Sequence, residues 1–353
     1  MSHSAVERVA DALLFEGYML YPYRPSAVKN RQRFNFGVVY PPSNEARDIE
    51  GADASRMRTV CLLEGDQDVR LTVKVRFLQL VQRTLGAYSR PASGEGQLAD
   101  FVPVDVLRVD DRTLQRWQEA VERAMLVQDV TVAALCVQPL CVPFTFPATE
   151  TLEPVHDAAG ALAGVIVRRQ RDIDAEVSLA ASELSPGLYR ISVQIDNVAP
   201  PDPARDGGRD ELLLRSLVSA HTILSAHRGA FISLLDPPET HAAHVAGCHA
   251  VRSWPVLVGA SGQRDTMLSS PIIIYDYPLI APESAGDLFD GTEIDEILSL
   301  RILTMTEAEK SEMRQTDERA RLLLERTELL DAESLMRMHG VMRAVSPLTV
   351  EHA

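Results

Sequence analysis

The sequence predicts an α+β protein in which antiparallel or sandwich-like sheets of short strands carry peripheral helices and a helical C-terminal tail. The clearest strand pattern is 188–195, where Tyr189, Ile191 and Val193 face inward and the intervening residues, Gln194 among them, face outward. Helical patterns occur near both termini and in the middle of the chain. They lack the regular strand–helix alternation that a doubly wound parallel sheet requires.

The first expected element is a short amphipathic helix over residues 5–15. Ser4 and Glu7 have the spacing of a capping box, and apolar residues at steps of three and four then share one helical face. Gly17 follows and ends this helix, because glycine accepts the left-handed backbone conformation that terminates many helices.

Several short segments have the alternation or the apolar run that is expected of strands. Two of them, 59–63 and 69–77, are expected to be separate strands joined by a turn at 64–66. The remaining strand candidates are 34–38, 164–169, 175–180, 188–195, 230–235 and 255–259.

Two helices are expected in the middle of the chain. Apolar residues recur at helical spacing over 112–125, where Asp110 or Asp111 would cap the first turn. The same spacing over 211–227 forms one apolar face, and Gly229 stands where a C-terminal glycine cap belongs.

The C-terminal tail is expected to be helical and charged. Thr306 and Glu309 form a second capping box, and a helix dense in charge is expected over 307–330. Arg321 and Glu325 are four residues apart and can pair along its surface. Such a helix leaves a structural role in a homo-oligomer open.

These patterns divide the chain into three expected regions. A mixed α+β region rich in strands covers 1–200, an α+β region covers 209–305, and the charged helical tail covers 306–353. Residues 200–208, with the sequence PPDPARDGG, have the composition of a linker or loop between the first two regions.

The composition limits the classes of partner. The 353 residues carry a net charge of −15, so no basic excess exists to displace counterions from a nucleic acid, and basic partners are favoured instead. No signal-peptide pattern and no apolar run long enough to insert into a membrane is visible, which predicts a cytoplasmic protein. The four cysteines are then expected to be thiols, namely Cys61, Cys136, Cys141 and Cys248. The apolar neighbours of Cys136 and Cys141 suggest that both are buried.

A candidate binding surface lies in two segments far apart in the sequence. The first is a cationic and aromatic patch, which we call the basic segment, made of Tyr21, Tyr23, Arg24, Lys29, Arg31 and Arg33. The second lies within 269–298, where an apolar, strand-like run at 271–274 precedes an aromatic and acidic stretch made of Tyr275, Asp276, Tyr277, Asp287 and Asp290. Opposite charge and restricting prolines suggest that the two segments form either an internal ion-pair network or one shared docking surface. Two unrelated solvated turns are the simpler alternative.

A metal site is an alternative hypothesis. On a helix, His241, His244 and Cys248 would share one face, and imidazole and thiolate are ligands that zinc or nickel accepts. Because the paired Cys-x-x-Cys signature of zinc sites is missing, the favoured interpretation is a polar helix whose histidines face solvent and whose cysteine is buried, and no cofactor is then expected.

The familiar catalytic motifs are missing. The sequence has no nucleophile elbow, no P-loop and no dinucleotide-binding glycine motif before a helix. His221 lies on an apolar face of its expected helix and is interpreted as a core histidine rather than a general base. The sequence therefore favours a non-enzymatic role and offers no catalytic residues.

Two stretches carry a resemblance. EGYMLYPYRPSAVKNRQRFNFGVVYPP at 16–42 and SSPIIIYDYPLIAPESAGDLFDGTEIDEILSLRI at 269–302 resemble an uncharacterised bacterial protein family encoded among nickel–iron hydrogenase structural and maturation genes. The resemblance implies an accessory or assembly protein whose partner is a hydrogenase subunit or a maturation factor. It supplies no established catalytic residues.

Overall fold

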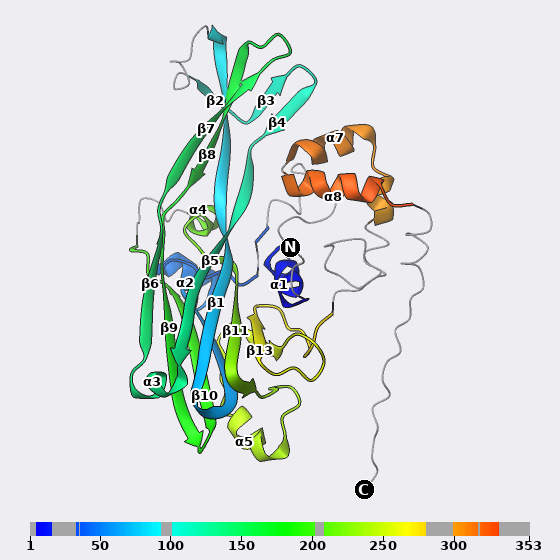
Figure 1. Ribbon diagram of the computed structural model, residues 1–353. Helices are drawn as coiled ribbons and strands as arrows, with labels where there is room; N and C mark the ends of the chain where they lie inside the picture. The colour runs from blue at the N-terminus through cyan, green and yellow to red at the C-terminus, as the bar shows by residue number, and fades with distance from the viewer. Residues whose placement is uncertain are drawn as a thin grey trace.

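The structure is a computed structural model that describes residues 5–15, 33–34, 36–92, 101–201, 208–279, 299–316 and 318–331. Its fold is α+β and its sheet is antiparallel, as the sequence predicts (Figure 1). Among the helices of these ranges, none is both long and apolar enough to span a bilayer.

One long strand, β1 (Arg56–Ala92), organises an 11-stranded sheet. Five strands pair with it in turn along its length: β10 (Leu188–Asn197), β11 (Val218–Phe231), β5 (Trp117–Thr131), β8 (Leu162–Gln170) and β2 (Val102–Val104). In the middle of β1, β11 and β5 flank it on opposite sides, so both of its edges are hydrogen-bonded there.

The remaining strands extend the sheet outward from these neighbours. On one side they are β9 (Ile173–Ser185) and β6 (Leu140–Phe146), and on the other β13 (Thr266–Ser270) and β12 (Trp254–Leu257). β7 (Thr149–His156) pairs with β8. β3 (Val106–Val109) and β4 (Arg112–Gln115) form a separate hairpin at the end of the molecule where β2, β7 and β8 lie (Figure 1).

Short helices lie around the sheet. They are α1 (Ala5–Phe15), α2 (Asn44–Glu50), α3 (Val132–Val137), α4 (Arg209–Leu213) and α5 (Ala242–Val245), followed by α7 (Glu307–Thr316) and α8 (Glu318–Glu328). The bounds of α1 agree with the predicted helix over 5–15.

The main apolar core lies on one face of the curved sheet. Leu71, Val73, Val75 and Phe77 of β1 are fully buried there, together with alternate residues of β5, β9, β10 and β11. The ring of Phe77 meets Phe146 of β6 edge to face, with centroids 5.3 Å apart. β1 therefore contributes both to the pairing of the sheet and to the main core along much of its length.

Helix α1 covers the part of the opposite face that β11 and β13 form. Val9 and Ala10 pack against Ile223 of β11 and Leu268 of β13. The Ser219 hydroxyl donates a hydrogen bond to the Leu13 carbonyl at 3.0 Å, which fixes the helix to the start of β11.

The predicted turn at 64–66 is a bulge inside β1. The register against β11 shifts between Gly65 and Arg70, yet β11 pairs with β1 on both sides of the shift. A Cβ at Gly65 would lie 2.2 Å from Val69 Cγ2 and 3.0 Å from the Arg228 carbonyl oxygen. The glycine therefore permits a close approach of two backbones, and the prediction of two strands was wrong.

The helix predicted over 112–125 was also wrong, because this segment forms β4 and β5. Met125 and Val127 alternate into the main core, while intervening charges pair with β1. Arg76 donates to Glu122 at 2.8 Å and Arg83 to Glu119 at 3.0 Å. These partners lie 46 and 36 residues away, so the local periodicity could not reveal them.

The helix predicted over 211–227 is replaced by the five-residue α4 and by β11. β11 lies between β1 and β13 and is covered on both faces, so residues 218–224 are all buried. Burial on both faces removes the alternation of apolar and polar residues that marks a half-exposed strand.

The predicted C-terminal helix is a pair of shorter helices, α7 and α8, that pack on each other around Met313 and Leu324. The capping box is confirmed, because Thr306 and Glu309 bond reciprocally. Arg321 pairs with Glu325 at 2.7 Å, as expected. Arg319 lies 3.1 Å above the ring of Phe15 and joins this helix pair to α1.

We predict that Ile191→Asp unfolds or aggregates the protein. Ile191 of β10 is completely buried in the main core, and an unpaired charge there costs at least about 3 kcal/mol. Ser192→Asp is the matched control, since its side chain lies on the other face of the same strand and is half-buried. Urea unfolding measures both variants. A soluble Ile191→Asp protein with the wild-type melting temperature would contradict the placement of β10.

Candidate functional site

The segment after β13 carries the exposed part of the candidate binding surface. The strand predicted over 271–274 is absent, because β13 ends at Ser270 and Pro271 has no N–H to continue the ladder. Residues 271–279 instead run along the surface without regular secondary structure. Ile274 turns inward and packs against the cluster that α1 forms with β11 and β13.

Asp276 fixes this segment to the body. One carboxylate oxygen accepts the backbone N–H of Leu257 at 2.7 Å, and the other accepts the hydroxyl of Ser233. The Ser233 oxygen in turn accepts the backbone N–H of Asp236 at 2.8 Å. A single carboxylate therefore joins the end of β12, the turn after β11 and the segment 271–279.

Tyr277 adds a second attachment. Its backbone N–H donates to the carbonyl of Leu257 at 2.7 Å, and its side chain packs against the main core. Its φ is 55°, a left-handed conformation that is unfavourable for a bulky residue. The hydrogen bonds of Asp276 and Tyr277 hold the backbone in this strained state.

Three apolar side chains of the same segment face solvent. Ile273 is 71%, Tyr275 86% and Leu279 74% exposed. We call these three residues the apolar ledge. They alternate with the inward-facing Ile274 and Tyr277, so their exposure follows from the attachment of the segment.

Arg33 is the one member of the basic segment that the structure describes, and it is buried. Only 4% of it is exposed, its guanidinium lies 3.5 Å from the ring centre of Trp117, and it donates to the Gln118 carbonyl at 2.7 Å. It therefore holds the start of β5 and does not offer its charge to a partner. The other predicted members of the surface, Tyr21, Tyr23, Arg24, Lys29, Arg31, Asp287 and Asp290, lie outside the described residues.

The proposed metal ligands lie on a short turn rather than on one helix. A 3₁₀ turn (Glu239–His241) leads into the four-residue α5, and Cys248 follows beyond it. The Nε2 of His241 lies 3.1 Å from the Glu64 carboxylate, and the Cys248 thiol donates to the His244 carbonyl at 3.6 Å. Within the described ranges, no group of three or more His, Cys, Asp or Glu residues could hold a metal ion.

Two cysteines differ from the prediction. Cys136 of α3 and Cys141 of β6 are exposed thiols, although both were expected to be buried. The apolar neighbours that suggested burial alternate with Cys141 along β6 and face the core, so the cysteine faces solvent. Cys61 is fully buried, and burial raises the pKa of its thiol.

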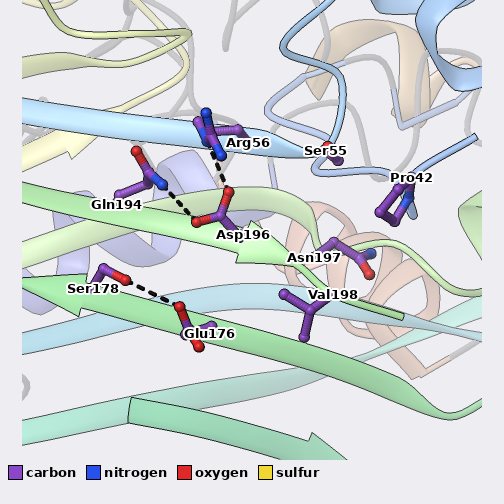
Figure 2. Close-up of a pocket in the computed structure, with 9 residues that line it drawn as sticks. All are labelled: Pro42, Ser55, Arg56, Glu176, Ser178, Gln194, Asp196, Asn197 and Val198. Atoms are coloured by element: carbon purple, nitrogen blue, oxygen red, sulfur yellow. Dashed lines mark hydrogen bonds and ion pairs between the residues drawn. The ribbon is translucent and has the colours of Figure 1, made fainter. Parts of the chain in front are cut away.

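A polar hollow of about 550 Å³ opens on the outer face of the sheet, where β9, β10 and the start of β1 lie side by side (Figure 2). Arg56, Asp196 and Glu176 occupy opposite positions on these three strands. Asp196 accepts from Arg56 Nε at 2.8 Å and from Gln194 Nε2 at 2.7 Å. Glu176 accepts from the Ser178 hydroxyl at 3.2 Å.

Sequence reasoning did not find this hollow. The outward position of Gln194 was predicted correctly and was the available signal. Glu176 and Asp196 meet on the consecutive strands β9 and β10, but Arg56 is 140 residues from Asp196, and no local pattern reveals that pairing.

His221 is buried, as expected of a core histidine, but it lies on a strand and in a polar layer. Its Nδ1–H donates to the Ser219 carbonyl at 3.2 Å, and its buried Nε2 has no hydrogen-bond partner among the described residues. The opposite residue on β1 is Arg76, whose guanidinium pairs with Asp11 of α1 and with Glu122. Burial, and then the nearby Arg76 charge, lower the pKa of His221 to about 4.

No protein-family model matches the chain, and no curated protein matches it.

We predict that the purified protein holds no stoichiometric zinc or nickel. His241 is engaged with Glu64, and Cys248 packs against the apolar side chains of Leu62 and Leu188. Elemental analysis of protein grown with both metals tests this. A stoichiometric ion that disappears in a His244→Ala, Cys248→Ala double variant would establish the metal site instead.

We also predict that His221 makes the protein lose stability as the pH falls from 6.5 towards 4. The folded pKa of about 4 lies below the value of 6.5 for an unperturbed histidine, so the unfolded chain binds the proton first. Full protonation favours unfolding by about 3 kcal/mol. Urea unfolding across this range should show a shallower loss for His221→Asn. His227→Asn, an exposed histidine on the same strand, should keep the wild-type slope, and equal slopes for all three proteins would contradict the assignment.

Proposed function

We propose that the chain is a non-enzymatic accessory protein that acts by binding another protein through the apolar ledge. The observation that carries the proposal is the exposure of Ile273, Tyr275 and Leu279 on an attached backbone. Apolar groups gathered on a protein surface mark interaction sites more often than scattered ones do. Tyrosine is also enriched among the residues that dominate the free energy of protein–protein binding.

The attachment of the ledge favours binding. A mobile surface segment loses conformational entropy when a partner immobilises it, and this loss opposes association. Asp276 and Tyr277 already hold the segment 271–279 in the free protein. The side chains of the ledge therefore meet a partner with little further ordering of the backbone.

The resemblance at 16–42 and 269–302 supports a partner among nickel–iron hydrogenase subunits or maturation factors, because the ledge lies inside the second stretch. The net charge of −15 favours a partner with a basic face. On this proposal, the remaining residues of the basic segment and the acids Asp287 and Asp290 contribute the polar part of the same surface.

We predict that an Ile273→Ser, Tyr275→Ala double variant folds normally but binds its partner more weakly. Both side chains are mainly exposed, so the melting temperature should stay within the range of ordinary surface substitutions. The dissociation constant for an immobilised hydrogenase subunit or maturation factor should rise roughly thirtyfold, which corresponds to about 2 kcal/mol.

Val137→Ser is the matched control for this experiment. Val137 of α3 is 88% exposed and is absent from the ledge, so its loss should leave both folding and capture unchanged. Equal capture by the wild type and the double variant would remove the ledge as the binding surface. Failure of the wild-type protein to bind any subunit or maturation factor would remove the hydrogenase link.

A further inference from the structure

The polar hollow on β9, β10 and the start of β1 contains two carboxylates that face each other. Asp196 and Glu176 lie directly opposite each other on neighbouring antiparallel strands. Like charges in opposite positions of a sheet are destabilising. A fold that keeps such a pair at one place on its surface gains from any cation that settles beside it.

The two carboxylates are satisfied unequally. One oxygen of Asp196 accepts a hydrogen bond from Arg56 and the other accepts one from Gln194, so its charge is compensated within the protein. Glu176 accepts a hydrogen bond from the Ser178 hydroxyl, and in the described part of the chain no cationic group pairs with it. Its negative charge is therefore available to a positive group in the hollow.

At the other side of the hollow, Arg56 offers positively charged hydrogen-bond donors. Its Nε is bonded to Asp196, and within the described residues its two terminal nitrogens have no partner. A guanidinium can bind a second carboxylate through such terminal N–H groups. Ser55 lies next to it in the lining, and its hydroxyl is a further donor.

We propose that this hollow binds a small zwitterion of the amino-acid class, with its ammonium group at Glu176 and its carboxylate at Arg56. β1 and β9 are two strand spacings apart, which places the backbones of these residues roughly 10 Å from each other. An α-amino acid with a hydrogen bond of about 2.9 Å at each end spans roughly 8–9 Å, a length that two side chains above the sheet can bracket. The side chain of the ligand would lie against Val198 and Pro42.

The zwitterion fits the hollow better than either half of it alone. A simple amine would satisfy Glu176 and leave the terminal nitrogens of Arg56 unused. A simple carboxylate would approach Glu176 and Asp196 without a positive charge of its own. This site shares no residue with the apolar ledge, so its test is independent of the proposed protein-binding function.

The test is a binding experiment on the full chain by NMR. The twenty amino acids are screened first, and alanine is then compared with ethylamine and propionate, which lack its carboxylate and its ammonium group respectively. We expect amino acids to shift backbone signals of β9, β10 and the start of β1, and alanine to bind at least about tenfold more tightly than either analogue.

Variants locate the ligand within the hollow. Glu176→Gln should weaken amino-acid binding at least about tenfold, since an amide loses the charge-assisted bond to the ammonium group. Asp129→Asn on β5 changes an exposed acid that is absent from the hollow and should have no effect. Equal binding of alanine and ethylamine would reduce the site to an acidic surface and overturn the proposal. The absence of any shift, or equal effects of the two variants, would overturn it as well.

Discussion

The backbone pairing of β1 is the constraint on which the other elements depend. This strand is paired successively with β10, β11, β5, β8 and β2, and it changes partners without a break in the chain. The bulge between Gly65 and Arg70 lets one continuous strand do this, because an extra stretch of chain changes the local twist and register. The main core, the polar hollow and the surface under α1 all involve β1, the strands that pair with it or the strands beyond those.

Cross-strand ion pairs complement this backbone pairing. Arg76 is almost completely buried and is held by Asp11 from α1 and by Glu122 from β5. Its desolvation would be costly without both acids, so the position of the first helix and that of β5 are electrostatically coupled. Farther along β1, Arg83 and Arg168 share the carboxylate of Glu119 in the same manner.

The elements that the sequence predicted correctly are those whose signals are local. The sequence of α1 follows the spacing of a capping box and has a one-sided apolar face, and β10 alternates strictly between core and surface. The helices predicted over 112–125 and 211–227 were wrong because β5 and β11 are strands. Their secondary structure is set by pairing with distant strands, which outweighs the intrinsic helix preference of these segments. The candidate site divides in the same way. Local composition marked 275–277 as part of a candidate binding surface, whereas the burial of Arg33 against Trp117 and the register that forms the hollow depend on tertiary pairing.

In the aromatic and acidic stretch, one segment combines hydrogen bonds that hold it to the body with apolar side chains that face solvent. Asp276 was expected to offer its charge to a partner, yet both of its oxygens are occupied by Leu257 and Ser233. The same hydrogen bonds that withdraw this acid from the surface fix the direction of Tyr275 beside it. Strain at Tyr277 opposes the arrangement, and the attachment to β12 outweighs that strain. The segment therefore gains stability from its polar groups, while the apolar side chains of Ile273, Tyr275 and Leu279 stay exposed to solvent.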